Sequence, residues 1–173
     1  MPSQKSRDLP AARLILIINT VNDDERYMRE ALTEAQRAFE LGEVPVGAVA
    51  VRDGVIIARG HNLRETRRDP TAHAEMIALQ QASQVLRGWR LLGTTLYCTL
   101  EPCAMCAAAM VHARLPRLVY GGSDPKMGAA GSVLNLTASP LLNHRIEVVG
   151  GVLAEEAEAI LARFFQRLRG TTE

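Results

Sequence analysis

Two cysteines separated by two residues, together with a histidine thirty positions upstream, constrain this fold more than any other feature. Cys103 and Cys106 follow Pro102, a residue favoured in the first turn of a helix, so both thiols are expected at a helix N-terminus. His73 stands at the start of another predicted helix, with Glu75 two residues later. Residues i and i+2 of a helix point in different directions, so these two serve one site only at a helix end. The fold must therefore bring two helix N-termini together.

The residue types at these positions indicate a zinc site with one open position. Thiolates and imidazole nitrogens are ligands that zinc prefers, and the dipole of a helix N-terminus favours thiolate over thiol. His73, Cys103 and Cys106 make three ligands. Structural zinc sites usually have four protein ligands, whereas catalytic sites leave one position for water. The third cysteine, Cys98, falls within a predicted strand, where a small buried residue is the ordinary interpretation.

Composition limits the class of protein without identifying it. The 173 residues suit one domain, and the apolar fraction of 47% is ordinary for a globular chain. A net charge of +1 does not indicate a nucleic-acid-binding protein, so phosphate contacts would depend on local clusters. Three cysteines without a secretory signature favour a reducing compartment, and we expect a cytoplasmic protein. No stretch approaches the ~20 apolar residues of a membrane span. The local basic clusters are Arg64, Arg67 and Arg68, and Arg163, Arg167 and Arg169.

The hydrophobic pattern predicts an α/β fold of three layers, α/β/α, around a five-stranded mixed sheet. Asp53-Gly54 is a strong hairpin signal, so the first two strands should be antiparallel. The strand–helix–strand order over 95–120 implies a parallel pair. Predicted strands are 46–51, 55–58, 95–100, 118–120 and 145–149, and predicted helices begin near Asp23, at Thr71, at Pro102 and at Ala154. We expect residues 1–22 to be a poorly ordered N-terminal extension and residues 23–173 to form a single zinc-dependent domain.

Several segments resemble the bacterial tRNA-specific adenosine deaminases, which belong to the cytidine-deaminase-like superfamily. The pattern H-x-E…P-C-x-x-C is a signature of zinc-dependent nucleobase deaminases. Segments 69–75, 99–106 and 128–132 carry the closest match, and the resemblance covers roughly residues 25–170. It implies a homodimer with one zinc per subunit. It also implies deamination of adenosine to inosine at the wobble position of a tRNA anticodon, chiefly that of an arginine tRNA.

The same resemblance implies roles for particular residues. Glu75 would transfer protons without binding the metal. Asn62 would hold the base, although an asparagine here also has the plain interpretation of a turn residue. The full set is His73, Cys103 and Cys106 for zinc, Glu75 for catalysis, and Asn62, Ala74, Val46, Asp124 and Lys126 for the substrate, the last two by contact with RNA.

Three other functions remain open from the residues alone. The same zinc chemistry serves deaminases of a free base or nucleoside, and the metal motif does not distinguish them. A non-catalytic zinc module that binds RNA or protein is disfavoured by the absence of a fourth ligand and by Glu75. An oxidoreductase would need reversible disulfide formation between Cys103 and Cys106, which tight zinc binding should block.

Overall fold

Five strands form one mixed sheet in the order β2-β1-β3-β4-β5. The computed structural model describes the backbone of residues 11–170 and the side chains of residues 23–170. Strand β1 is antiparallel to both β2 and β3, whereas β3, β4 and β5 are parallel. The elements are α1 (Ala11–Glu40), β1 (Gly47–Arg52), β2 (Val55–His61), α2 (Arg64–Arg67), α3 (Ala74–Val85), β3 (Thr94–Leu100), α4 (Ala104–His112), β4 (Arg117–Gly122), β5 (Glu147–Val149) and α5 (Ala154–Gly170).

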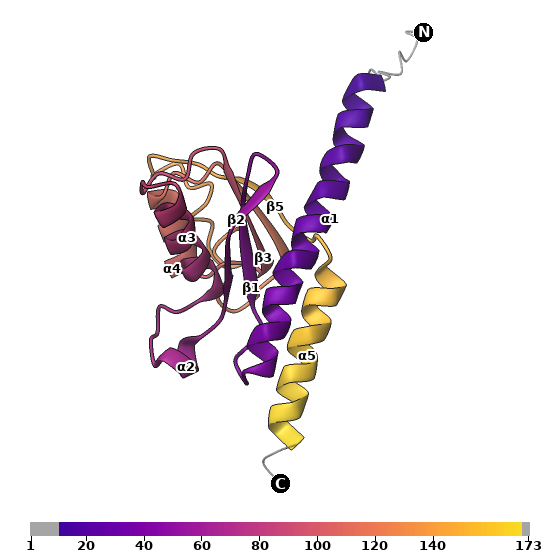
Figure 1. The fold of residues 1–173 in the computed structure, drawn as a ribbon, viewed down its shortest axis with the longest axis vertical. Coiled ribbons are helices and arrows are strands. Elements are labelled where there is room, and N and C mark those ends of the chain that lie inside the picture. Colours follow the sequence, from indigo (N-terminus) through magenta and orange to yellow (C-terminus); the bar gives the residue numbers. More distant parts are fainter. Residues whose placement is uncertain (1–10, 171–173) are drawn as a thin grey trace, which may run out of the picture.

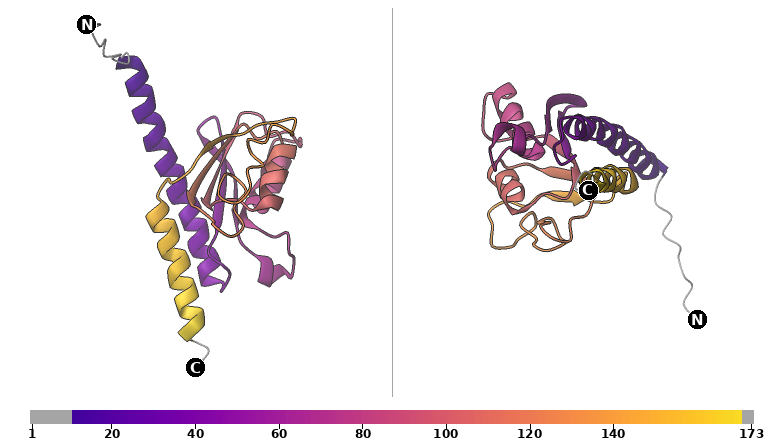
Figure 2. Two further views of the ribbon diagram at one scale, coloured as in Figure 1. Left: turned by 180° about the vertical axis from the view of Figure 1, so that it is seen from behind. Right: turned by 90° about the horizontal axis from the view of Figure 1, so that it is seen from below.

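Helices cover both faces of the sheet, which confirms the three-layer prediction. Helices α1 and α5 lie together on one face, and α3 and α4 lie on the other (Figure 1). The views in Figure 2 show the same separation, with the N-terminal part of α1 extending past the sheet. No helix in the described part of the chain is long and apolar enough to span a membrane.

The hairpin between β1 and β2 has the predicted turn. Asp53 and Gly54 both have positive φ angles, 51° and 76°, as a two-residue turn of this kind requires. The strands pair antiparallel on either side, with an irregularity in register between Ala50 and Val51. The short hairpin holds β2 at one edge of the sheet, beside α3.

Side chains along β1 alternate between two hydrophobic cores. Ala48 and Ala50 pack into the larger core, which includes residues of α3 and α4. Val49 and Val51 point to the other face and pack with Tyr27 of α1. This alternation follows from the period of two in a strand. The small side chains on the α3 side let that helix approach the sheet closely.

Helices α1, α3 and α4 begin at other residues than predicted, and α2 was not predicted. Helix α1 begins at Ala11 and not near Asp23, because no glycine or proline interrupts the chain between Ala11 and Leu41. Residues 11–22 of the expected extension thus belong to this helix, and residues 1–10 lie outside the described part. Helix α3 begins at Ala74 and not at Thr71. A four-residue helix, α2, also forms within a polar segment that carries no apolar periodicity.

The start of α4 is also later than predicted. It begins at Ala104, so Pro102 is not within its first turn. Cys103 has an extended backbone, with φ −71° and ψ 174°, and is the N-cap of α4. Because an N-cap residue keeps non-helical angles, the helix cannot include the residues before it.

Candidate active site

His73, Cys103 and Cys106 meet at one point, although thirty residues separate the histidine from the first cysteine. The Nδ1 atom of His73 lies 3.8 Å from Sγ of Cys103 and 3.6 Å from Sγ of Cys106. All three ligand atoms lie within 4.8 Å of one another, and no other such group occurs in the described part of the chain. Zinc–sulfur and zinc–nitrogen bonds at a tetrahedral ion separate the ligand atoms by about 3.6 Å. The donors therefore fit a single zinc ion in type and in spacing.

Two N-caps supply the first ligand of each helix. His73 is the N-cap of α3 (φ −76°, ψ 152°) and Cys103 is the N-cap of α4, and neither side chain caps its own helix. Cys106 follows one turn into α4, so it faces the same point as Cys103. Helix α3 follows β2 and α4 follows β3, and these two strands run in the same direction because both are antiparallel to β1. Both helix starts therefore lie at the carboxyl edge of these strands, where ligands of α/β proteins commonly bind. The sheet thus places the metal ligands at this edge.

The two thiols have opposite pKa shifts in the absence of a cation. A hydrogen bond from Cys106 lowers the pKa of the Cys103 thiol to about 4, and the imidazole of His73 adds to this effect. The thiolate of Cys103, together with burial, raises the pKa of Cys106 well above its ordinary value. One proton therefore serves two sulfurs. A divalent cation would replace this proton and favour thiolate at both positions.

Glu75 lies in the first turn of α3 and is only 4% exposed. Burial raises the pKa of its carboxyl group, while its own backbone N–H and His73 act in the opposite direction. Glu75 does not belong to the group of converging ligand atoms. A buried carboxyl with a raised pKa beside a candidate metal site is suited to accepting and releasing a proton during a reaction.

A cavity of about 240 Å³ opens beside the ligands. It is lined by His73, Glu75 and Cys103. Four of the five residues assigned to the substrate also line it, namely Val46, Asn62, Ala74 and Asp124. Lys126 does not line the cavity. It is exposed on the loop after β4, and its backbone N–H donates to the carboxylate of Asp124. The cavity is lined further by Val44, Arg64, Leu100, Glu101 and Met127, which sequence analysis did not assign.

Glu101 organises the loop that follows β4. Its carboxylate accepts hydrogen bonds from the backbone N–H groups of Asp124, Ala130 and Ser132, each at 3.0 Å, and from the hydroxyl of Ser132. Burial raises the pKa of Glu101, but these hydrogen bonds outweigh it and the net shift is downward. A carboxylate directly after a buried strand and before Pro102 was the available signal for this role.

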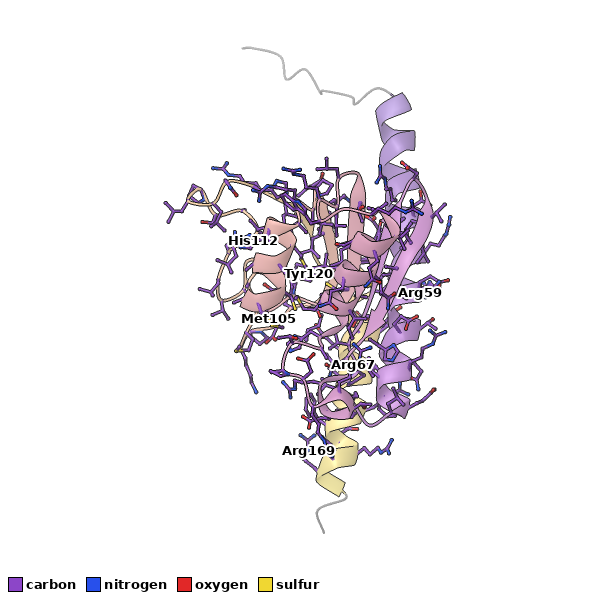
Figure 3. The ribbon with its side chains drawn as sticks, turned by 60° about the vertical axis from the view of Figure 1, so that its left-hand side comes forward. Arg59, Arg67, Met105, His112, Tyr120 and Arg169 are labelled. Carbon is purple, nitrogen blue, oxygen red and sulfur yellow. The ribbon has the colours of Figure 1, made fainter. Side chains whose placement is uncertain are left out.

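Arginines surround the end of the molecule that carries α2. Arg64, Arg67 and Arg68 are exposed on or beside this short helix. Figure 3 shows Arg67 and Arg169 toward the same end of the molecule, where α5 terminates. Two arginines of α5, Arg163 and Arg167, lie over the ring of Phe39 at 5.5 and 5.7 Å. The two basic clusters thus flank one end of the fold.

Residues 22–169 match the family of MafB19-like deaminases. The tRNA-specific adenosine deaminase of Bacillus subtilis is 52% identical over 149 residues, which cover 86% of this chain and 92% of that protein. The protein of the same name from Haemophilus influenzae is 52% identical over 147 residues, covering 84% and 85%.

Solved structures with the same fold include one from a study of A-to-I editing by tRNA:A34 deaminases at the wobble position of transfer RNA. It has a TM-score of 0.76 and 45% identity, and the match covers 78% of this chain and 98% of that one. A guanine deaminase from Nitrosomonas europaea, with 24% identity and a TM-score of 0.71 over 81% and 83%, shares the fold.

Proposed function

The chain belongs to the MafB19-like deaminases and, among them, to the tRNA-specific adenosine deaminases, and we propose that its substrate is the wobble adenosine of a tRNA anticodon. Conversion of adenosine to inosine in tRNA is the reaction that its relatives support. The observation that carries the mechanism is one cavity that holds a three-donor metal site and a buried carboxyl outside the ligand set.

His73, Cys103 and Cys106 would hold one zinc ion, with an open fourth position toward the cavity. Zinc bound there would act as a Lewis acid and would lower the pKa of water to roughly 7. Glu75 then accounts for the proton transfers. Its carboxylate accepts a proton from the attacking water and delivers it to N1 of adenine, and the water oxygen bonds to C6. Glu75 next accepts the proton of the new C6 hydroxyl and passes it to the amine, and the C6–N bond then breaks, so adenosine and water give inosine and ammonia.

Contacts with the base would come from Asn62, Val46 and Ala74, which line the cavity together with His73 and Cys103. Asn62 is 7% exposed and lines the cavity, and its backbone N–H donates to the carbonyl of Val46 at 3.0 Å. Val46 contributes an apolar surface for the ring. Ala74 is the first residue of α3, so its N–H has no acceptor within the helix and suits the leaving-group side of the base.

Contacts with RNA outside the cavity would come from Asp124 and Lys126, which lie on the loop held by Glu101, and from Arg64, which also lines the cavity. We also propose a homodimer in the cytoplasm and an arginine tRNA as substrate, which the resemblance implies.

The decisive experiment is inosine mapping in tRNA after incubation with the zinc-loaded protein. We expect inosine at the wobble position, and we expect Glu75→Gln to lose activity while keeping its zinc. Free adenosine, cytosine and guanine are tested in parallel. Turnover of one of these without inosine in tRNA would identify a small-molecule deaminase and refute the proposal. Loss of zinc in Glu75→Gln would make Glu75 a ligand instead.

A further inference from the structure

Glu43 is a buried carboxylate that is held by hydrogen bonds and not by an ion pair with a residue of the described part of the chain. Its side chain is 1% exposed, and no arginine, lysine or histidine within residues 23–170 forms an ion pair with it. Glu34, which is buried to the same extent, instead pairs with Arg37 at 2.8 Å and with His61 at 3.0 Å. A buried charge is costly unless it is paired or hydrogen-bonded. The contacts of Glu43 therefore indicate what holds it in place.

Three N–H donors converge on the Glu43 carboxylate. The backbone N–H of Thr66 donates to Oε1 at 2.6 Å, and that of Glu65 donates to Oε2 at 3.2 Å. Burial raises the pKa of Glu43. The hydrogen bonds from Thr66 and Glu65 and the charge of Arg64 together lower it by more than burial raises it, so the net shift is downward. The group is thus ionised at neutral pH, and both of its oxygens act only as acceptors.

Glu65 and Thr66 are the second and third residues of α2. The N-cap of this helix is Leu63, which has no side-chain acceptor and makes no capping hydrogen bond. Glu43 performs this function from a position twenty residues away in the chain. It therefore fixes the short helix that presents Arg64 to the cavity.

The third donor is the side-chain amide of Asn62, whose Nδ2 lies 3.3 Å from Oε2 of Glu43. The side-chain amide of asparagine has an NH₂ group that donates and an oxygen that accepts, and a carboxylate can form hydrogen bonds only with the NH₂ group. The carboxylate therefore selects one of the two orientations of the Asn62 amide. It leaves Oδ1 and one Nδ2–H for a ligand in the cavity that Asn62 lines.

We propose that Glu43 is a positioning residue, which sets the orientation of the Asn62 amide and at the same time anchors α2 at the rim of the cavity. This inference rests on the proposed role of Asn62 in holding the base. It explains why a buried carboxylate is kept where a neutral side chain of similar size would avoid the cost of burying a charge.

Glu43→Gln tests the inference because it changes little except the acceptor pattern. If the new carbonyl accepts from Thr66, the new NH₂ group faces Glu65 and Asn62, and the Asn62 amide must turn over. We expect kcat/KM for tRNA to fall about 10- to 100-fold, the size of one lost buried hydrogen bond or two. We expect zinc content to remain unchanged. Glu34→Gln is the matched control, because it removes a charge of equal burial that does not contact Asn62.

A double-mutant cycle with Asn62→Ala separates positioning from general destabilisation. If Glu43 acts through Asn62, the loss of kcat/KM caused by Glu43→Gln should be clearly smaller once Asn62 is alanine, and the loss that remains is the contribution of the α2 anchor. An equal loss in both backgrounds would overturn the inference. Should Glu43→Gln not fold, Glu43→Asp, which keeps the charge but is one methylene shorter, completes the same cycle.

A measurement independent of activity distinguishes this inference from the proposed function. In the wild-type protein the side-chain NH₂ protons of Asn62 should exchange slowly with solvent in NMR spectra, because one is bonded to a buried carboxylate. Glu43→Gln should lose this protection and Glu34→Gln should retain it. Protection that survives in Glu43→Gln refutes the positioning role whether or not tRNA is the substrate, whereas an inactive wild-type protein with normal protection would contradict only the proposed function.

Discussion

Replacing Gly60 with alanine should damage the metal site from a position outside it. Gly60 lies in β2 where the strand touches the backbone of α3, and a Cβ there would lie 2.3 Å from the carbonyl oxygen of Ala74 and 2.9 Å from the nitrogen of Ala78. Ordinary contacts begin at 3.4 Å, so the first turn of α3 must retreat by roughly 1 Å. Both His73 and Glu75 adjoin Ala74. Overpacking of this kind costs about 1–3 kcal/mol, and a displacement of 1 Å can lower a rate by about 100-fold.

The matched control is Gly88→Ala, because its Cβ would meet nothing nearer than 3.9 Å. Both glycines have φ angles that alanine accepts, so only the steric contact differs. Zinc content by atomic absorption, the unfolding midpoint by circular dichroism and inosine formation in tRNA are measured for each variant. We expect Gly60→Ala to lose activity and part of its zinc, and Gly88→Ala to match the wild type. A Gly60→Ala protein with normal stability, zinc and rate would refute the close approach of β2 and α3.

Three further predictions concern the metal, acid and salt. Removing zinc with a chelator should lower the free energy of unfolding, as measured by calorimetry. The expected loss is about 2.7 kcal/mol relative to protein in which free zinc stands at a hundred times its Kd. An unchanged unfolding midpoint would exclude a bound ion. The pKa values of Glu43 and Glu101 are both lowered from 4.5 on folding, so the stability they contribute is complete above that pH and is lost as pH falls through the lowered values. Urea unfolding should therefore show an acid loss that is shallower in Glu101→Gln, and an identical pH slope in the variant would contradict this. Neutralising Arg67 should reduce the slope of log affinity for tRNA against log salt by about 0.7–0.9, and an unchanged slope would exclude a phosphate contact at that residue.

Local signals were sufficient for two of the strand pairings, although not for the order of the whole sheet. Asp53 and Gly54 specify their turn through backbone angles alone, and the parallel pair of β3 and β4 follows from the helix between them. The helix starts were harder to predict. Pro102 favours the first turn of a helix in general, but here the extended backbone of Cys103 delays the helix by two residues.

The convergence of His73, Cys103 and Cys106 could be predicted from the sequence, because a zinc site restricts both residue type and spacing. Glu43 and Glu101 could not be assigned in the same way, because each acts on backbone N–H groups more than twenty positions away. The position of Glu101 directly after a strand marks it as unusual, but the local sequence does not identify the N–H groups that either carboxylate binds. Only the tertiary fold shows that these carboxylates fix segments on two sides of the cavity.

The choice of His73 and Cys103 as N-caps has a consequence for stability. A serine, threonine, aspartate or asparagine at each position would satisfy a free N–H of its helix and contribute about 1 kcal/mol. Neither His73 nor Cys103 forms such a bond, so α3 and α4 each begin without a side-chain cap. The positive ends of two helix dipoles consequently face one point, where they favour the thiolate of Cys103 and any negative charge that develops on a bound base. The fold thus gives up stability at both helix starts, and a bound cation is the interaction that would restore it.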